Sequence, residues 1–244
     1  SFIIERHTES KFGLRVAIGF DETVTLSTPN ATHSEAVYVS GVRGGSRDGG
    51  GYLAKIDNLA AGDPNQVFFR QIDTLNNDGS GAADRAEDVA VDSNGYVYVV
   101  GSTEGDLGNQ KVDPIAKDIF LQKYDSAGNL LFTRRLGAPV DGSAFSVKVD
   151  SNDNVFVSGQ VQGILTENGH GGGYDTFVTK FDKNGLELFT RQAAPFANDG
   201  ALSMSLDSDN NVFLAGFTQS EIAPGEGFGG NTDAFITKLD NSGN

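Results

Sequence analysis

The chain has no cysteine, no tryptophan and a single methionine among its 244 residues. Without cysteine there can be no disulfide bridge, thiolate metal site or cysteine nucleophile. Basic residues are scarce too, since 18 lysines and arginines stand against 33 aspartates and glutamates, for a formal net charge of −15. Nucleic-acid binding depends on basic residues that neutralise phosphates, so we expect no nucleic-acid partner. An anionic membrane surface is disfavoured for the same reason.

Long hydrophobic runs are also absent, and no stretch approaches the roughly 20 apolar residues of a membrane-spanning helix. We therefore expect no membrane insertion. The chain opens at Ser1 without a hydrophobic signal-peptide segment, as a processed chain or a fragment would. Glycine, in contrast, is abundant with 32 residues, and Phe, Val and Thr are spread evenly. This composition predicts an all-β protein of many short strands joined by tight turns.

One unit of roughly 57 residues recurs along the chain. Its first half is a strand, an Asp/Asn-rich turn and a second strand ending in glycine, and the copies span 89–101, 147–159 and 204–216. Its second half reads Asp-x-Phe-x-x-Lys-x-Asp at 118–125, 175–182 and 233–240, and a strand such as Leu130–Arg134 follows. Earlier, more divergent copies occupy 36–41 and 51–57. Each unit therefore predicts a four-stranded antiparallel meander.

The third strand of a unit is apolar on both faces, as Phe120, Leu121 and Tyr124 show. This pattern favours sheets stacked against neighbours on both sides, which is how the blades of a β-propeller pack. We expect one domain over 1–244 with about four blades, at approximately 13–73, 84–137, 142–194 and 199–244. Phe2–Arg6 resembles a fourth strand and either completes the last blade, closing a four-bladed ring, or belongs to a larger propeller.

These motifs resemble the bacterial SBBP-type β-propeller repeat, whose consensus is Val-Asp-x-x-Gly-Asn-Val-Tyr-Val-x-Gly followed by Asp-Ala-Phe-Val-x-Lys-Leu-Asp-x-x-Gly. The likeness covers 84–244 well and is weak over 1–83, where Gly51 replaces the Asp that precedes the third strand. Members of the family are typically exported or cell-surface bacterial proteins without a shared enzymatic activity. The resemblance thus implies a secreted, periplasmic or cell-surface location.

Residues that recur in every unit are most simply explained by the scaffold, whereas function should lie in what occurs once. A recurring lysine with acidic neighbours therefore indicates an ion pair within each blade, at Lys55, Lys123, Lys180 and Lys238. The loops between the second and third strands vary most, and they span 44–50, 103–117, 160–174 and 218–232. They should emerge on one face, and their aromatic residues Tyr174 and Phe228 are the candidate ligand-binding residues.

The acidic turns raise the question of calcium, because they place oxygen ligands at alternate positions, as calcium loops do. The residues concerned are Asp150, Asn152, Asn154, Asp207, Asp209 and Asn211. The glycine and the final glutamate of a calcium loop are missing, with Val212 and Thr218 in their places. Asp and Asn are also ordinary turn formers at a hairpin tip, so turn formation is the first interpretation and Ca²⁺ binding the second.

No catalytic arrangement is visible, because His7, His33 and His170 lie at unrelated positions in different units. The leading hypothesis is a non-catalytic scaffold that binds a protein partner within a larger assembly. The alternative is a glycan-binding propeller, or an accessory domain of a secreted hydrolase. A lectin should repeat an exposed aromatic residue in the same loop of each blade, whereas these loops differ in length and content.

Overall fold

The structure is a computed structural model, and it describes residues 15–20, 35–43, 50–57, 65–72, 82–107, 117–136, 141–166, 173–192, 198–219 and 232–244. All regular structure in these ranges is β-strand, which confirms the all-β prediction. These ranges contain no helix long and apolar enough to cross a membrane.

The strands form four separate antiparallel sheets, each with its strands paired in chain order. The first sheet comprises β1 (Arg15–Phe20), β2 (Glu35–Arg43), β3 (Gly50–Asp57) and β4 (Asn65–Ile72). The second comprises β5 (Asp84–Val91), β6 (Val97–Thr103), β7 (Asp118–Tyr124) and β8 (Leu130–Leu136). The third comprises β9 (Asp141–Val149), β10 (Val155–Gln162), β11 (Tyr174–Phe181) and β12 (Glu187–Gln192). The fourth comprises β13 (Asp199–Leu206), β14 (Val212–Thr218) and β15 (Asp233–Leu239).

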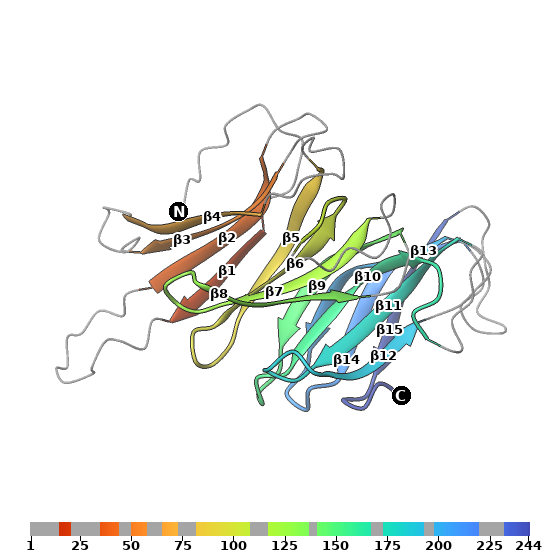
Figure 1. The fold of residues 1–244 in the computed structure, drawn as a ribbon. Coiled ribbons are helices and arrows are strands. Elements are labelled where there is room, and N and C mark those ends of the chain that lie inside the picture. The colour runs from red at the N-terminus through yellow and green to blue at the C-terminus, as the bar shows by residue number, and fades with distance from the viewer. Residues whose placement is uncertain are drawn as a thin grey trace.

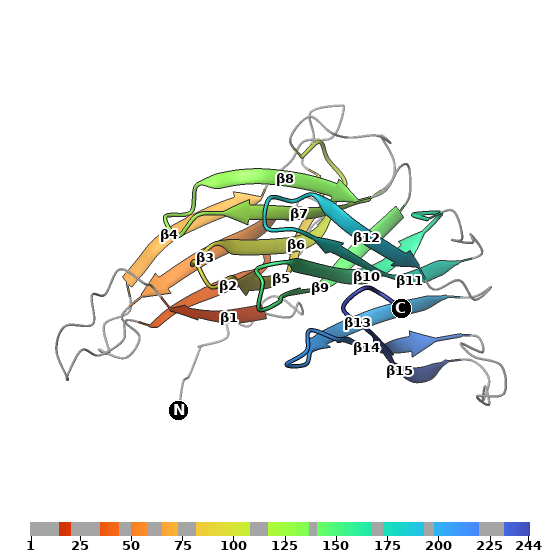
Figure 2. The same ribbon diagram turned by 90° about the horizontal axis from the view of Figure 1, so that it is seen from below.

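The four sheets lie in a row, and in both views the first sheet is at one end and the fourth at the other (Figures 1 and 2). Each pair of neighbouring sheets encloses its own hydrophobic core, and we call the interface between two neighbouring sheets a seam. Leu121, Leu136, Val147 and Phe177 pack together in the seam between the second and third sheets. Phe156, Val178 and Met204 pack in the seam between the third and fourth sheets.

Central strands are buried on both faces, as their apolar pattern predicts. Every residue of β6 and of β7 is buried, because each strand contacts one neighbouring sheet with its odd-numbered and another with its even-numbered side chains. The contrast is β15, where exposed and half-buried residues alternate. Among the described residues, one face of the fourth sheet is therefore not covered by a neighbouring sheet.

A bulge recurs where the first and second strands of a unit pair. The register shifts at Ala86/Asp88 against β6, next to Gly159 in β10, and at Ala201/Ser203 against β14. The bulge brings the backbone of the first strand so close to the glycine opposite it that no side chain fits between them. A Cβ at Gly159 would lie 2.0 Å from the Ser143 carbonyl oxygen, and the equivalent distances at Gly101 and Gly216 are 1.7 and 1.9 Å. The bulge explains the glycines of β6, β10 and β14.

The described strands form an open row, with the first and fourth sheets apart. Phe2–Arg6, which the sequence suggested as the strand that completes the last blade, lies outside the described residues. In the described part of the chain the fourth sheet has three strands, so β15 is an edge strand. The turn after β15 has the same backbone hydrogen bond as the turns after β7 and β11. The Gly243 N–H donates to the Asp240 carbonyl oxygen at 2.9 Å, as Gly128 does to Asp125 and Gly185 to Asp182.

Candidate functional site

The acidic turns proposed as calcium ligands form side-chain hydrogen bonds to their own backbone. Asp150 Oδ1 accepts the N–H groups of Asn152 and Asn154, both at 2.8 Å, and its Oδ2 accepts the Asn154 side-chain amide at 2.9 Å. Asp207 repeats the arrangement with Asp209 and Asn211. These carboxylates therefore close the turn that precedes each second strand.

Calcium binding by these turns stays a prediction from the sequence. Asp150 Oδ2 also lies 3.4 Å from Lys180 Nζ, so a cation would compete with an ammonium group and two backbone donors. Among the described residues, no group of three or more Asp, Glu or His side chains is placed to hold a metal ion.

We expect EDTA to leave the melting temperature of the chain unchanged, because the turn carboxylates are already bound by protein donors. Differential scanning calorimetry with EDTA, and separately with millimolar CaCl₂, measures this. A rise of several degrees in CaCl₂ that is lost on changing Asp150 or Asp207 to asparagine would contradict the expectation and assign calcium to these turns.

The same turns make stability depend on acid pH. Hydrogen bonds from the Asn211 side chain and backbone lower the pKa of Asp207 from 3.8 to about 2, and bonds from the Asn244 backbone lower that of Asp240. A carboxyl with a lowered pKa in the folded state stabilises the fold above its unfolded pKa. This contribution is lost as pH falls through the folded pKa.

We therefore expect the urea midpoint to fall between pH 4 and pH 2. Asp207→Asn should show a smaller fall over this range, because the variant has no carboxyl to protonate at this turn. Urea titrations of both proteins at the two pH values, followed by circular dichroism, test this, and equal falls would contradict it.

Three of the four recurring lysines form an ion pair within their own sheet, and the partner is the aspartate of the acidic turn. Lys123 Nζ lies 3.9 Å from Asp92, Lys180 3.4 Å from Asp150 and Lys238 3.3 Å from Asp207. Each ammonium also lies within 5 Å of an aromatic ring of its own sheet, namely Tyr98, Phe156 or Phe213. Burial lowers the pKa of Lys123 despite the nearby Asp92.

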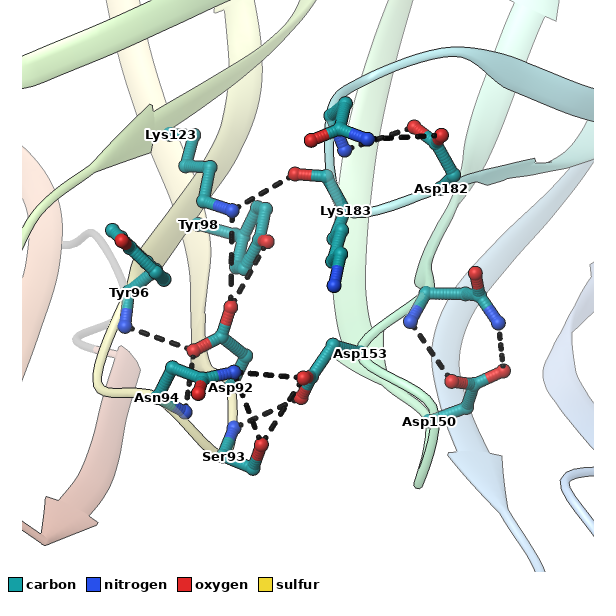
Figure 3. Close-up of polar contacts among 12 residues, drawn as sticks. Asp92, Ser93, Asn94, Tyr96, Tyr98, Lys123, Asp150, Asp153, Asp182 and Lys183 are labelled. Atoms are coloured by element: carbon teal, nitrogen blue, oxygen red, sulfur yellow. Dashed lines mark hydrogen bonds and ion pairs between the residues drawn. The ribbon is translucent and has the colours of Figure 1, made fainter.

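These lysines also bridge neighbouring sheets. Lys123 donates to the Lys183 carbonyl of the third sheet at 2.8 Å, as Figure 3 shows, and Lys180 donates to the backbone and side chain of Asn241 in the fourth. The hairpin tips are linked as well. Asp153 accepts bonds from the Ser93 backbone and hydroxyl at 3.1 Å, and Asn210 accepts the equivalent bond from Ser151 at 3.2 Å.

A second bridge, missed from the sequence, uses the Phe-x-Arg segment of each fourth strand. The arginine Nε donates to the carbonyl of a glycine in the next sheet at 2.6–2.8 Å, and its guanidinium lies over the phenylalanine of its own strand. The pairs are Arg70 with Gly128, Arg134 with Gly185, and Arg191 with Gly243. The glycines have φ near +80°, and a Cβ there would lie 2.7–2.9 Å from the phenylalanine ring.

A groove between the second and third sheets has side chains that differ from those at the next seam. It holds about 490 Å³ and is lined by Asp92, Asn94, Tyr96, Lys123, Lys183 and Asn184, among others. Tyr96 and Lys183 are not repeated at the next seam. Asn154 and Asn241 stand at the equivalent positions there. Figure 3 shows the hairpin tip and Lys183 on either side of it. The groove lies at the turn end of the sheets, not among the variable loops.

The candidate ligand residues from those loops are separate from this groove. Tyr174 donates its hydroxyl to Asp141 Oδ2 at 2.7 Å and its backbone N–H to Asn198 at 3.1 Å. The bond to Asp141 raises the pKa of Tyr174 to about 12. Tyr174 is half-buried, and its role in ligand binding stays a prediction. Phe228 lies outside the described residues.

The uncovered face of the fourth sheet departs from the repeat in the described part of the chain. Ile236 is 81% exposed, whereas its equivalents Leu121 and Val178 are 0% and 2% exposed. Phe213 is half-buried, while the equivalent Phe156 is fully buried. Exposed aliphatic side chains beside partly covered aromatic ones are typical of a surface that binds another protein. We call this surface, formed by Phe213, Ile236 and Lys238, the open face.

Comparisons with known proteins agree with this repeat architecture. The family model of the SBBP beta-propeller repeat matches residues 67–108, which run from β4 past the end of β6. The chain is also similar to the regulatory protein FlaEY of Caulobacter vibrioides, with 28% identity over 268 aligned residues that cover 97% of this chain. The chain spans 27% of the length of that relative. The resemblance seen in the motifs is confirmed, and the chain carries a β-propeller repeat of the SBBP family.

Proposed function

We propose that this protein is a non-catalytic scaffold, exported or displayed on a bacterial surface, that binds a protein partner through the open face. The observation that carries the proposal is the exposure of Ile236 at a position that is buried in the second and third sheets. The similarity to a protein named as regulatory, and to a β-propeller repeat family, supports a role in binding rather than catalysis.

The seams support the same role. Their recurring charged residues bind each other and the backbone of the next sheet, so they stabilise the stack of sheets. In Asp92 and Asp150 the carboxylate oxygens accept backbone N–H groups, which leaves them poorly placed as general bases. Among the described residues, the open face is a surface that departs from the repeat, and function in a repeat protein should lie where the repeat is broken.

A pull-down from the surface fraction of the source bacterium tests the proposal. The bait is the full chain, and mass spectrometry identifies what it retains. Ile236→Glu should abolish retention, because it places a charge in the centre of the interface. Leu188→Glu is the matched control, since Leu188 is 50% exposed on β12 of the third sheet. Equal retention by both variants would exclude the open face as the binding surface.

Glycan binding is the second candidate, and the groove beside Tyr96 favours it. This groove combines a half-buried aromatic side chain with amide and amino groups from Asn94, Asn184 and Lys183, which are groups that bind sugar hydroxyls. Binding on a glycan array that Tyr96→Ala abolishes and Ile236→Glu preserves would establish this function instead.

A further inference from the structure

The groove between the second and third sheets departs from the repeat on two walls that face each other. At the hairpin tip of the second sheet, Tyr96 stands where the third sheet has Asn154. On the turn of the third sheet, Lys183 stands where the second sheet has Ser126 and the fourth has Asn241. Both side chains line the groove, and Figure 3 shows the tip and Lys183 on either side of it. The two changes bring one aromatic ring and one positive charge to a single groove.

The two walls of the groove are held in place by hydrogen bonds between the sheets. Lys123 Nζ donates to the Lys183 carbonyl oxygen at 2.8 Å. The Arg134 guanidinium donates to the carbonyl oxygens of Asn184 and Gly185 at 3.3 and 2.8 Å. These bonds fix the backbone of the turn without using its side chains. A groove that is already formed loses little freedom when a ligand binds.

The carboxylates beside the groove are already bonded within the protein. Asp92 Oδ1 accepts the N–H groups of Asn94 and Tyr96, both at 2.9 Å. Its Oδ2 accepts the Tyr98 hydroxyl at 3.1 Å. Asp153 also accepts hydrogen bonds, and the shortest of them, at 2.8 Å, comes from the Asn94 side chain. Protein donors therefore already supply what a bound cation would offer these oxygens.

Lys183 provides the charge that is free to act on a ligand. The residue is exposed, and among the described residues its ammonium has neither a hydrogen bond nor an ion pair. Lys123 adds a second positive charge to the lining, where its side chain is 8% exposed and its Nζ lies 4.2 Å from the centre of the Tyr96 ring. An anionic group bound in the groove would therefore form a charge-assisted hydrogen bond with Lys183, close to a second ammonium group.

The rest of the lining suits a sugar ring. Tyr96 and Phe132 are half-buried and Leu131 is 49% exposed, so together they offer apolar surface to the C–H groups of a ring. The exposed side chains of Asn94 and Asn184 carry amides that both donate and accept hydrogen bonds, as sugar hydroxyls do. The groove volume of about 490 Å³ lies within the range of small-molecule sites.

We propose that this groove binds a saccharide that carries a carboxylate, such as a uronic acid unit of an acidic polysaccharide. This inference rests on the glycan-binding function and names the class of glycan. The sugar ring lies against Tyr96, its hydroxyls bond to the amides of Asn94 and Asn184, and its carboxylate pairs with the Lys183 ammonium. Lys183 is thus the residue that selects acidic over neutral sugars.

Calorimetric titration of the full chain with acidic oligosaccharides and their methyl esters tests this inference. The probes are trisaccharides of galacturonate, mannuronate and glucuronate, because esterification removes the charge and keeps the ring. We expect at least one acid to bind, and its ester to bind about tenfold more weakly. Lys183→Gln should weaken binding of the acid to the level of the ester and leave binding of the ester unchanged, since the pair needs both charges.

Two further variants separate the charge from the ring. Tyr96→Ala should weaken binding of the acid and of the ester by the same factor, because both present the same sugar face to the aromatic ring. Lys117→Gln is the matched control for Lys183→Gln. Lys117 pairs with Glu104 at the other end of the second sheet, and its side chain is 43% exposed. Its loss removes the same charge away from the groove and should leave binding of the acid unchanged.

The outcomes distinguish this inference from the function on which it rests. Equal binding of acid and ester would overturn the acidic class and leave glycan binding in place. Binding that survives both Lys183→Gln and Tyr96→Ala would mean that the sugar binds elsewhere, and it would overturn the inference. So would the absence of binding by all three acids at about 1 mM. In that case binding of neutral sugars on the glycan array decides whether the glycan-binding function fails as well.

Discussion

Gly159→Ala is expected to destabilise the chain by about 4 kcal/mol, a large share of the stability of an ordinary domain. The added Cβ would lie 2.0 Å from the Ser143 carbonyl oxygen and 2.9 Å from Ala144 Cα, and both contacts are backbone. Relief would require the β9 bulge to move, and β9 packs against the second sheet through Ala144 and Val147. Urea denaturation followed by circular dichroism measures the loss.

Gly95→Asn is the matched control for this prediction. Gly95 has a φ of +78°, yet Asp153 and Asn210 adopt +63° and +62° at the equivalent turn position of the next sheets. No atom lies within 4 Å of a Cβ placed on Gly95. Asparagine tolerates this conformation, so the variant should differ from the parent by less than about 1 kcal/mol. Equal losses for the two glycines would show that the bulge is not the reason for the recurring glycine.

Lys180→Met is expected to cost about 3 kcal/mol, because it leaves a buried carboxylate without its counter-ion. The Asp150 side chain is 0% exposed and the Lys180 side chain 8% exposed, and the ammonium also bonds to Asn241 of the fourth sheet. Methionine keeps the aliphatic stem over Phe156 and removes only the charge and its donors. Chemical denaturation with the melting temperature as a second readout measures the loss.

Lys238→Met is the matched control for Lys180→Met. In the described structure no fourth strand and no further sheet covers Lys238. Its ion pair to Asp207 is equally short, at 3.3 Å, but the two side chains are 51% and 29% exposed. A solvated pair contributes little, so the cost should be much smaller than that of Lys180→Met. The difference between the two variants measures what the neighbouring sheet adds, and a cost for Lys238→Met as large as for Lys180→Met would contradict the account of the open face.

The regular part of the fold could be predicted from the sequence because the repeat fixes it. Short apolar runs bounded by Asp/Asn turns located the strands, and the predicted ion pair of the recurring lysine within each blade is present at Lys123 and Lys180. The bridges between sheets were not predicted. Arg134 and Gly185 lie 51 residues apart, and pairing them requires the packing of one sheet on the next. The recurrence of Phe-x-Arg and of the turn glycine in the same units was the available signal.

The candidate binding residues were harder to predict for a physical reason. Sequence variation pointed to the loops and to Tyr174, whose hydroxyl the structure places on Asp141. The open face is invisible in the sequence, because Ile236 follows the repeat pattern as faithfully as Leu121 and Val178 do. What differs is the neighbour that covers it. Tyr96 could have been found, since an aromatic residue replaces the asparagine that stands at 154 and 211.

The most direct test of the open face as a docking surface is amide hydrogen exchange of the full chain, with and without the partner that the pull-down identifies. The account predicts added protection confined to β14, β15 and the turn at 240–244, since a protein bound at the open face shields these strands from solvent. Ile236→Glu should remove that protection. Unchanged exchange in β15 with the partner present, or protection centred on the groove at Tyr96, would contradict it.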